Sequence, residues 1–292
     1  MPGTVLTVLV REIDDSIGLL GVGAGHEDQA WRSGALAQDL IEWAADWILT
    51  QDEIESFSAG NAVRLISKAL GRVYTSQKYE GRGEVGELLL HIVLRKFLNS
   101  ERAISRIYFK DAPNDTVKGF DAVHVVEKSG KAGAQTELEL WLGESKFYVD
   151  SAQAVSAVLS ELEEHLKTNY LRTEFAAISD KLSPHWEHSD RLKALLSREV
   201  SLDTVFSCVV IPVFITFDDD ITARHQSSSE AYVTEVSAML TKEWTAFRTK
   251  LNNRTLPREI RVQLILLPMA TKSKLISAFD GRLKAWQAMS NH

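Results

Sequence analysis

The chain has 292 residues, 45% of them hydrophobic and 25% charged, and a formal net charge of -7. This composition is typical of globular proteins and excludes a disordered or fibrous chain. The acidic balance also argues against a surface that binds nucleic acid over its whole extent, because non-specific affinity for a duplex comes largely from neutralising phosphates. A local basic patch, or a partner that holds the nucleic acid, is still compatible with it.

The sequence also excludes an intrachain disulfide and an apolar membrane span. No apolar run reaches the roughly 20 residues that cross a bilayer. The N-terminus has no basic leader, so we expect a cytoplasmic protein. The single cysteine, Cys208, lies in the apolar run 205–217, which predicts a buried structural thiol within a strand.

The N-terminal part of the chain is predicted to be a mainly helical appendage over 1–80. Its expected elements are a strand over 4–10, a helix over 28–50 with Trp43 and Trp47 in its core stripe, and a helix over 59–74. The polar, glycine-containing break 76–83 predicts a boundary with a second domain over 81–292.

A glycine-rich stretch, 21–26, resembles a phosphate-binding turn. The third glycine of the dinucleotide fingerprint falls on His26, however, and the strand that should precede it is doubtful. A flexible loop is the favoured interpretation.

The second domain is predicted to be α/β, with a C-terminal βα extension. Its expected elements are a nearly all-apolar helix over 84–98, strands over 103–109, 118–128 and 136–148, a helix over 151–169, a strand over 205–217, a helix over 228–251, a strand over 259–267 and a helix over 272–289. A hairpin followed by crossover connections predicts a mixed central sheet with helices on both faces.

One apolar strand carries charges that need an explanation. Glu144 and Lys146 lie two residues apart in the strand 136–148, so both point to one face of the sheet. If the hairpin is symmetrical about its turn-rich loop at 129–133, residues whose numbers add to about 265 face each other, and Asp121 then faces Glu144. Two carboxylates in that position repel unless a cation lies between them, and oxygen ligands suit Mg²⁺ or Mn²⁺. The alternative without a metal is that Glu144 and Lys146 form an ordinary salt pair at a sheet edge.

A third acid, Glu87, lies on the apolar helix 84–98. It shares a helical face with His91, Leu94 and Leu98, so its carboxylate lies on a face otherwise suited to burial. It either joins the metal site or makes an ordinary interaction with His91 or with the helix N-terminus.

Three other groups are set aside. His185, Glu187 and His188 suggest a metal site, but Pro184 favours a surface loop or a helix start, and no third ligand has suitable spacing. The acidic run 218–220 is expected to cap or solvate a turn. A basic cluster near the proposed site is expected to be a solvated face or, second, a strip that contacts phosphates; it comprises Arg95, Lys96, Arg102, Arg106 and Lys110.

The pattern of a helical Glu, then Gly-Phe-Asp, then Glu-x-Lys resembles the PD-(D/E)xK nuclease superfamily, with Phe120 where proline is usual. More narrowly, the chain resembles the nuclease subunit of Hachiman-type antiphage defence, the HamA-like proteins. The segments that carry this resemblance are Gly-Glu-Leu-Leu at 86–89, Lys-Gly-Phe-Asp-Ala-Val-His at 118–124 and Leu-Gly-Glu-Ser-Lys-Phe-Tyr at 142–148.

The resemblance implies a restriction-endonuclease-like core and a role for each residue. Asp121, Glu144 and the Ser145 carbonyl would ligate the divalent metal, and Glu87 would bind it directly or through water. Lys146 would orient the attacking water. The family further implies a HamB-like helicase partner that keeps the nuclease in check until it engages foreign or damaged DNA.

These features lead to a metal-dependent DNA nuclease with little sequence preference as the expected function. The alternative is a catalytically silent nuclease fold that serves as an interaction platform for a DNA-processing partner, favoured by the acidic net charge. A hydrolase that uses paired carboxylates without metal is the third possibility.

Overall fold

A computed structural model gives the architecture, and it describes all residues except 15, 75–82, 106–118, 129–136, 258 and 291–292. The strands are β1 (Thr7–Glu12), β2 (Ile17–Gly23), β5 (Glu101–Ile104), β6 (Ala122–Lys128), β7 (Glu137–Phe147), β8 (Val209–Asp218) and β9 (Arg261–Met269), with a separate short pair, β3 (His26–Glu27) and β4 (Ala30–Trp31). In the described part of the chain, seven of them form one sheet in the order β1-β2-β9-β8-β7-β6-β5.

The sheet is mixed, as the sequence predicted. Its centre is parallel, because β2, β9, β8 and β7 pair in that way, while β1 and the β5–β6–β7 end pair antiparallel. Parallel strands are usually covered on both faces, which explains why β8 is an almost continuous apolar run. Within β8, Val213 and Ile215 belong to one core and Phe214 to the other.

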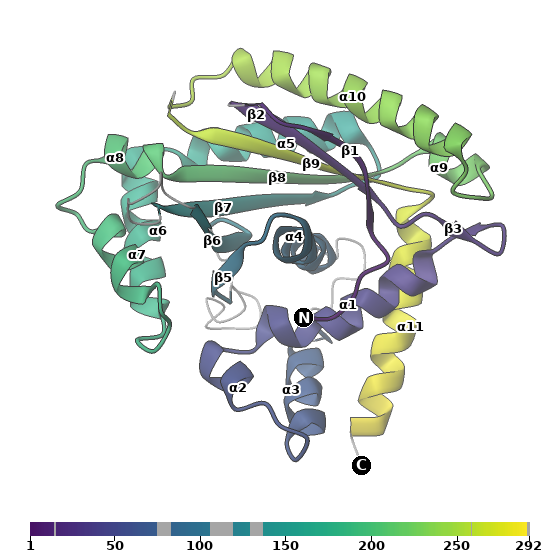
Figure 1. Cartoon of the computed structure of the whole chain (residues 1–292), viewed down its shortest axis with the longest axis horizontal. Coiled ribbons are helices and arrows are strands. Elements are labelled where there is room, and N and C mark those ends of the chain that lie inside the picture. The colour runs from purple at the N-terminus through teal and green to yellow at the C-terminus, as the bar shows by residue number, and fades with distance from the viewer. Residues whose placement is uncertain (15, 75–82, 106–118, 129–136, 258, 291–292) are drawn as a thin grey trace.

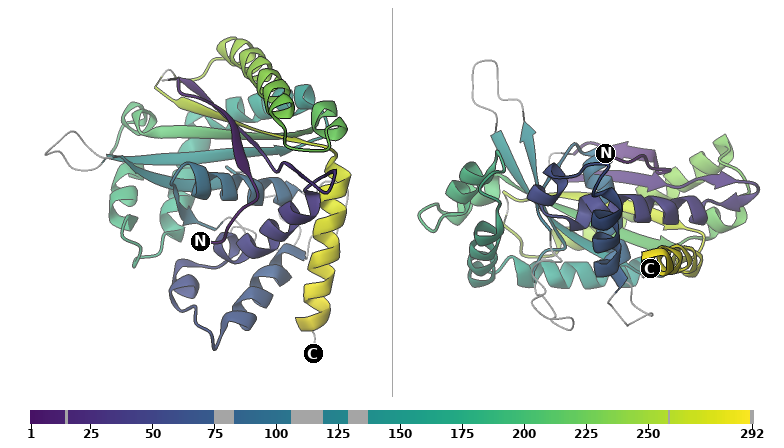
Figure 2. Two further views of the ribbon diagram at one scale, coloured as in Figure 1. Left: turned by 45° about the vertical axis from the view of Figure 1, so that its right-hand side comes forward. Right: turned by 90° about the horizontal axis from the view of Figure 1, so that it is seen from below.

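Helices cover both faces of the sheet, which confirms the predicted fold class (Figures 1 and 2). One face carries α5 (Ser151–His165), α6 (Thr168–Lys181), α7 (Ser189–Leu196) and α10 (Glu230–Asn252). The other carries α1 (Ser33–Ile48), α3 (Ala62–Tyr74), α4 (Gly83–Phe97) and α11 (Lys272–Ser290). Three short helices complete the chain, namely α2 (Gln51–Glu55), α8 (Leu202–Ser207) and α9 (Asp220–Arg224).

The glycine-rich stretch near the N-terminus is only in part a loop. Its first three residues form the end of β2, a strand that is buried along its whole length, and only Ala24 and Gly25 connect β2 to β3. A side chain on Gly21 would place its Cβ 2.6 Å from Leu240 of α10 and 2.7 Å from Val10 of β1. Glycine is needed here because two neighbours approach the backbone closely, and the prediction of a loop was wrong for residues 21–23.

The first long helix also begins later than predicted. Asp28 and Gln29 have φ values of 49° and 61° and form the turn between β3 and β4, so the helix starts at Ser33. Its core stripe is as expected, with Trp43 fully buried and Trp47 4% exposed. Cys208 lies outside the strand where it was predicted: it caps α8, it is half-buried, and β8 begins at Val209.

The first 80 residues contain the helices α1, α2 and α3, but two of their segments, β1 and β2, join the central sheet. α1 also packs against α11 near the C-terminus (Figure 2). The division into two domains at residue 80 therefore remains a prediction, and the expected boundary segment lies almost wholly outside the described residues. None of the described helices is long and apolar enough to cross a membrane.

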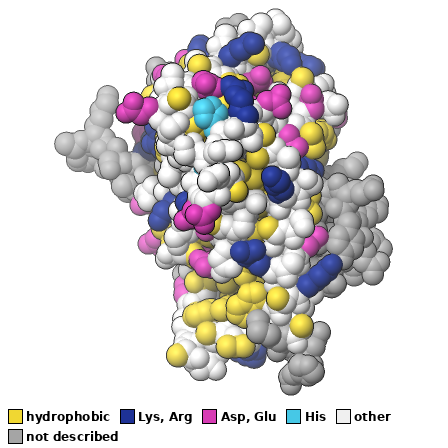
Figure 3. Space-filling model, turned by 90° about the vertical axis from the view of Figure 1, so that its right-hand side faces the viewer, with side chains coloured by type: hydrophobic (Ala, Val, Ile, Leu, Met, Phe, Trp, Pro, Cys, Tyr) yellow, Lys and Arg dark blue, Asp and Glu magenta, His cyan; other side chains and the backbone are white. Residues whose placement is uncertain are grey.

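The face that carries α11 shows how surface charge is distributed (Figure 3). Acidic and basic side chains are interspersed on this face, and hydrophobic side chains gather toward one end of it. Although the chain has a net charge of -7, this face therefore carries side chains of both signs.

Candidate active site

The hairpin formed by β6 and β7 has the register that the sequence predicted. Its Cα partners run from Ala122 and Gly143 to Lys128 and Glu137, so that each pair of numbers adds to 265. Asp121 comes immediately before the first pair and Glu144 immediately after it. The two carboxylates thus belong to the same end of the hairpin.

Asp121 is held by hydrogen bonds from the opposite strand. Its backbone N–H donates to the Gly143 carbonyl at 2.7 Å, and its Oδ2 accepts from the N–H and the Oγ of Ser145 at 2.8 and 2.9 Å. These bonds fix the Asp121 side chain beside β7.

Glu144 is the most deeply buried acid of the hairpin end, with 1% of its surface exposed. Burial raises the pKa of Glu144 to about 7; the charge of Asp121 acts in the same direction, and the hydrogen bond with His165 opposes it. The imidazole of His165, at the end of α5, lies with Nδ1 2.6 Å from Glu144 Oε1. The ring of His165 is in turn stacked on Tyr170 at 4.6 Å and meets Phe120 edge-on at 5.2 Å.

Lys146 lies on the same face of β7, as its spacing from Glu144 predicted. Its Nζ is 3.9 Å from Glu144 Oε2 and forms a hydrogen-bonded ion pair with Glu161 of α5. Burial alone would lower the pKa of Lys146, but the hydrogen bond with Glu161 and the charge of Glu144 raise it above its ordinary value. The side chain therefore stays protonated despite being 8% exposed.

The residue before Glu144 must be small. A Cβ on Gly143 would lie 2.9 Å from Leu90 Cδ2, 3.1 Å from Ala122 Cβ and 3.2 Å from Pro212 Cγ. Pro212 has no N–H to donate to β7. The pairing between β7 and β8 is therefore interrupted here: Trp141 pairs with Val210, and the next pair is Glu144 with Val213. Glu144 thus begins the stretch where the two strands pair again.

The helix α4, which carries Glu87, packs on the opposite face of β7 from α5. The neighbour of Glu87 in α4, Gly86, packs so tightly that a Cβ there would lie 3.0 Å from Phe147 Cβ and 3.4 Å from Ser145 Oγ. Ser145 is the residue that holds Asp121, so the half-buried Glu87 is next to the contact between α4 and the hairpin end. Glu144 and Lys146 instead face α5, which is the helix that contributes their partners.

His91 does not pair with Glu87, contrary to one alternative. It is 1% exposed, and its Nε2 lies 2.8 Å from Asp46 Oδ2 while its Nδ1 lies 3.3 Å from His124 Nε2. His124 Nδ1 lies 2.8 Å from Ser100 Oγ. Burial lowers the pKa of His91 to about 4 and that of His124 well below its ordinary value, so both rings are neutral. Each hydrogen-bond donor in this buried series of side chains then has an acceptor.

The basic cluster is used inside the protein. Arg95 donates to the Ser100 carbonyl at 2.8 Å and pairs with Asp46, and Arg102 donates to the carbonyls of Trp47 and Leu49 at the end of α1. Arginine at the last carbonyls of a helix is a stabilising arrangement. These two side chains are engaged within the chain and do not form a solvated face, whereas Lys96 of the same cluster is exposed. Arg106 and Lys110 lie outside the described residues.

The acidic run is a helix cap, as expected. Asp219 Oδ2 accepts hydrogen bonds from the N–H and Oγ1 of Thr222 at 2.7 and 2.8 Å and caps the N-terminus of α9.

Comparison with protein families decides where the chain belongs. A family model for HamA matches residues 4–283, which is nearly the whole chain. The chain belongs to the HamA family. This membership makes it a subunit of Hachiman-type antiphage defence. No curated protein matches the sequence.

In this HamA family member, the structure brings Asp121, Glu144, Ser145 and Lys146 together at one end of the hairpin, with Glu87 on the adjoining helix. Sequence reasoning missed His165 and Glu161, which bind Glu144 and Lys146. The available signal was their spacing of four residues on the helix that directly follows β7, which places both on one helical face.

Proposed function

We propose that this HamA family member is a divalent-metal-dependent deoxyribonuclease of the PD-(D/E)xK type, the effector that hydrolyses phosphodiester bonds with little sequence preference. The observation that carries the proposal is the meeting of two acids and one lysine, Asp121, Glu144 and Lys146, at the end of one hairpin, with Glu144 and Lys146 buried. Buried charges are costly without a role or a partner, and this set matches the needs of phosphodiester hydrolysis.

The donor set fits Mg²⁺ or Mn²⁺. Asp121 and Glu144 would hold the ion, together with the Ser145 carbonyl and with Glu87 directly or through water, and all of these are the oxygen donors that such hard cations prefer. The raised pKa of Glu144, caused by burial and then by Asp121, supports this fit, because a cation between the two acids would remove the cost of ionising both. A bound divalent ion supplies Lewis acidity and makes a water molecule easier to deprotonate.

The other side chains position the reactants. Lys146 is protonated and lies beside Glu144, so it can orient the attacking water and oppose the charge that develops on the phosphate. Glu161 holds its ammonium group, and His165 holds Glu144 in one orientation.

A helicase partner of the HamB type would bring the DNA, and the complex would act in the cytoplasm. The acidic net charge supports this division of labour, because a chain of charge -7 gains little from non-specific attraction to phosphates. We expect the partner to keep the nuclease in check until it engages foreign or damaged DNA.

One observation favours the alternative, a catalytically silent platform. In the structure each charged group already has a partner within the chain: Asp121 binds Ser145, Glu144 binds His165 and Lys146 binds Glu161. The same contacts are compatible with a nuclease at rest, so activity decides between the two.

The test is DNA cleavage by the chain and by its complex with the helicase, with Mg²⁺ or Mn²⁺ and with EDTA. Glu144→Gln and Lys146→Ala should each lower cleavage at least about a hundredfold, as expected when a group that stabilises the transition state is removed. Glu164→Gln is the matched control, because Glu164 is an exposed acid on the same helix whose ion-pair partner among the described residues is Lys167.

Two results would contradict the proposed nuclease function. Unchanged cleavage by both site variants would remove the assignment of these residues. If no cleavage occurs with any partner, and Asp121→Ala leaves phage protection intact, the silent platform is the correct function.

A further inference from the structure

A second group of ligand-type side chains lies away from the hairpin end, where the loop before α7 meets β5. His188, at the start of α7, has a side chain that is only 6% exposed. Its Nε2 lies 3.4 Å from Glu187 Oε1 and 3.6 Å from Glu101 Oε2. One ligand atom from each of these three residues lies within 4.8 Å of the other two. Glu101 is the third ligand that sequence spacing could not supply.

These contacts are not hydrogen bonds. Among the described residues, the buried imidazole of His188 has carboxylates around it at 3.4 to 3.7 Å but no hydrogen bond, for which the usual N···O distance is about 2.7–3.2 Å. Two ligands on one tetrahedral zinc ion, each about 2.0–2.1 Å from the metal, are roughly 3.3–3.4 Å apart. The Nε2 to oxygen distances are close to that separation.

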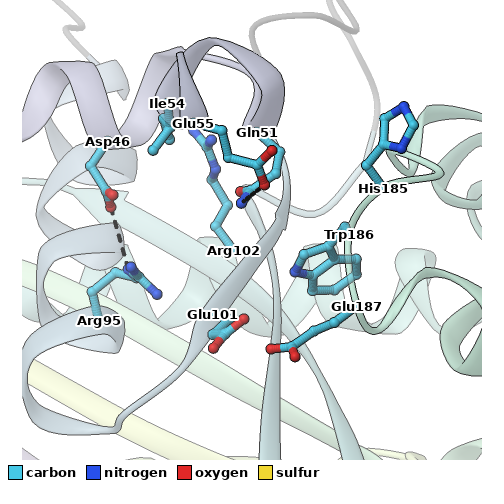
Figure 4. Close-up of a pocket in the computed structure, with 10 residues that line it drawn as sticks. All are labelled: Asp46, Gln51, Ile54, Glu55, Arg95, Glu101, Arg102, His185, Trp186 and Glu187. Carbon is cyan, nitrogen blue, oxygen red and sulfur yellow. Dashed lines mark hydrogen bonds and ion pairs between the residues drawn. The ribbon is translucent and has the colours of Figure 1, made fainter. Parts of the chain in front are cut away.

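The two carboxylates also face each other without a strong cation. Figure 4 shows Glu101 and Glu187 pointing toward one another from β5 and from the loop. In the described part of the chain, their ion-pair partner is His188, and neither has a lysine or arginine partner. Their side chains are 48% and 73% exposed, and a cation between them would offset their mutual repulsion.

We infer that Glu101, Glu187 and His188 bind a first-row transition-metal cation, with Zn²⁺ as the ion that one imidazole and two carboxylates fit best. This site is separate from the proposed nuclease centre and shares none of its residues.

A carboxylate also lies near the second ring nitrogen of His188. Nδ1 is 3.7 Å from Glu127 Oε1, and Arg191 holds the same oxygen at 2.6 Å. A metal-ligating imidazole usually donates its other N–H to a carboxylate, and Glu127 would accept that hydrogen bond when a metal binds. Trp186 meets the His188 ring edge-on at 5.1 Å and limits its rotation.

The proposed metal site is open to a pocket on one side, and a bound ion would link two parts of the fold. Glu101 and Glu187 line a pocket of about 470 Å³, which leaves room for water in a fourth coordination position. Glu101 begins β5 and pairs with Val125 of β6, so a bound ion would join the loop before α7 to the edge of the sheet.

The test measures metal binding by the full-length chain carrying Glu144→Gln, so that the proposed nuclease centre cannot account for the result. After EDTA treatment and dialysis, Zn²⁺ is titrated by calorimetry, and Co²⁺ is titrated by visible absorption. We expect one equivalent of Zn²⁺ and the absorption of a low-symmetry Co²⁺ site.

Adding Glu187→Gln should weaken Zn²⁺ binding by more than the roughly 10–100-fold that loss of an outer partner costs, and Glu127→Gln should weaken it by about that amount. Glu187 decides the matter because its side chain is 73% exposed, so its loss cannot unfold the protein. His185→Ala, an exposed histidine in the same loop, should bind Zn²⁺ like the parent.

The proposal is overturned if the parent binds no Zn²⁺, if Glu187→Gln binds it as tightly as the parent, or if His185→Ala weakens it equally. None of these outcomes depends on nuclease activity. The metal-site proposal can therefore be wrong while the proposed nuclease function is correct, and the nuclease function can be wrong while the metal site exists.

Discussion

Glu144 lies between an imidazole and an ammonium group, yet its pKa is raised to about 7 because burial outweighs both. The favourable contacts with His165 and Lys146 do not recover the hydration that the carboxylate loses. A side chain in this situation is poised to gain from a cation, which is why it is the best single probe of the site.

The raised pKa predicts how Glu144 affects stability. A carboxyl group with a folded pKa above its ordinary value of 4.5 stabilises the protein fully below pH 4.5, and this contribution is lost as the pH rises through about 7. From pH 7 to pH 5, the free energy of unfolding of the wild type should therefore rise by about 2 kcal/mol relative to Glu144→Gln. Urea denaturation of both proteins at each pH measures the difference.

Comparison with the variant is needed because other buried groups have the opposite sign. The lowered pKa of His91, due mainly to burial, costs stability as the pH falls from 6.5 toward about 4, but it does so in both proteins. A constant difference between wild type and Glu144→Gln would show that Glu144 is solvated or paired more strongly than its surroundings indicate.

Sequence reasoning could place some of these residues and not others. Strand periodicity and the symmetry of the hairpin gave the register that puts Asp121 and Glu144 at one end. Nothing in the spacing of His91 indicated Asp46, because the partner lies 45 residues away on another helix and depends on how α1 and α4 pack.

At the level of elements, the contact between α4 and β7 depends on one glycine. A Cβ on Gly86 would lie 3.0 Å from Phe147 Cβ and 3.6 Å from Phe147 N, and neither atom can move without moving the strand. The distance between helix and strand is thus set at the point where Ser145 holds Asp121.

Gly86→Ala should push α4 away from β7, destabilise the protein by about 1–3 kcal/mol as in other overpacked cores, and lower nuclease activity. Gly71→Ala is the matched control, since Gly71 is a glycine in the helix α3 with open space where its Cβ would be. That change should be neutral or stabilising by up to about 1 kcal/mol. Thermal unfolding and cleavage rates of both variants provide the measurement, and equal behaviour of the two would contradict a close approach at Gly86.

Elements with a strongly periodic pattern of hydrophobic residues were predictable from the sequence, and elements that depend on tertiary packing were not. The helices α4, α5 and α10 follow their patterns closely, and β8 does so from Val209 onward, because the first four residues predicted for it belong to α8 and its cap. β2 was missed because Gly21 and Gly23 resemble a loop until α10 and β1 are seen against them. The stretch 170–204 has mixed polarity, and α6, α7 and α8 form there because Leu171, Leu192 and Val205 are buried in a shared core.

For the whole molecule, the sheet joins the two ends of the chain. β2, near the N-terminus, lies between β1 and β9, and Ile265 of β9 pairs with both Leu20 and Phe214. α1 and α11 are also in contact, with Arg282 donating to Gln38 at 3.3 Å. This arrangement predicts one cooperative unit, whereas the proposed division at residue 80 predicts two.

Ile265→Ala should lower the free energy of unfolding by about 2–5 kcal/mol, because Ile265 is fully buried. If the molecule unfolds as one unit, hydrogen exchange should then speed up equally in β2, β7 and β9. Val63→Ala, a truncation at a 71% exposed position, is the control and should change stability by less than about 0.5 kcal/mol. Unchanged exchange in β2 would support two separately folding domains.

The position of β2 also has a consequence for synthesis. The parallel partner of β2 is β9, Arg261–Met269, so a nascent chain still on the ribosome must carry the β1–β2 hairpin without this neighbour until β9 has been translated. Contacts between such distant segments form late, because a long loop must close first. Chains that terminate before β9 would contain the β6–β7 hairpin but not the complete sheet that supports it, so the candidate site would have its full support only after β9 is made.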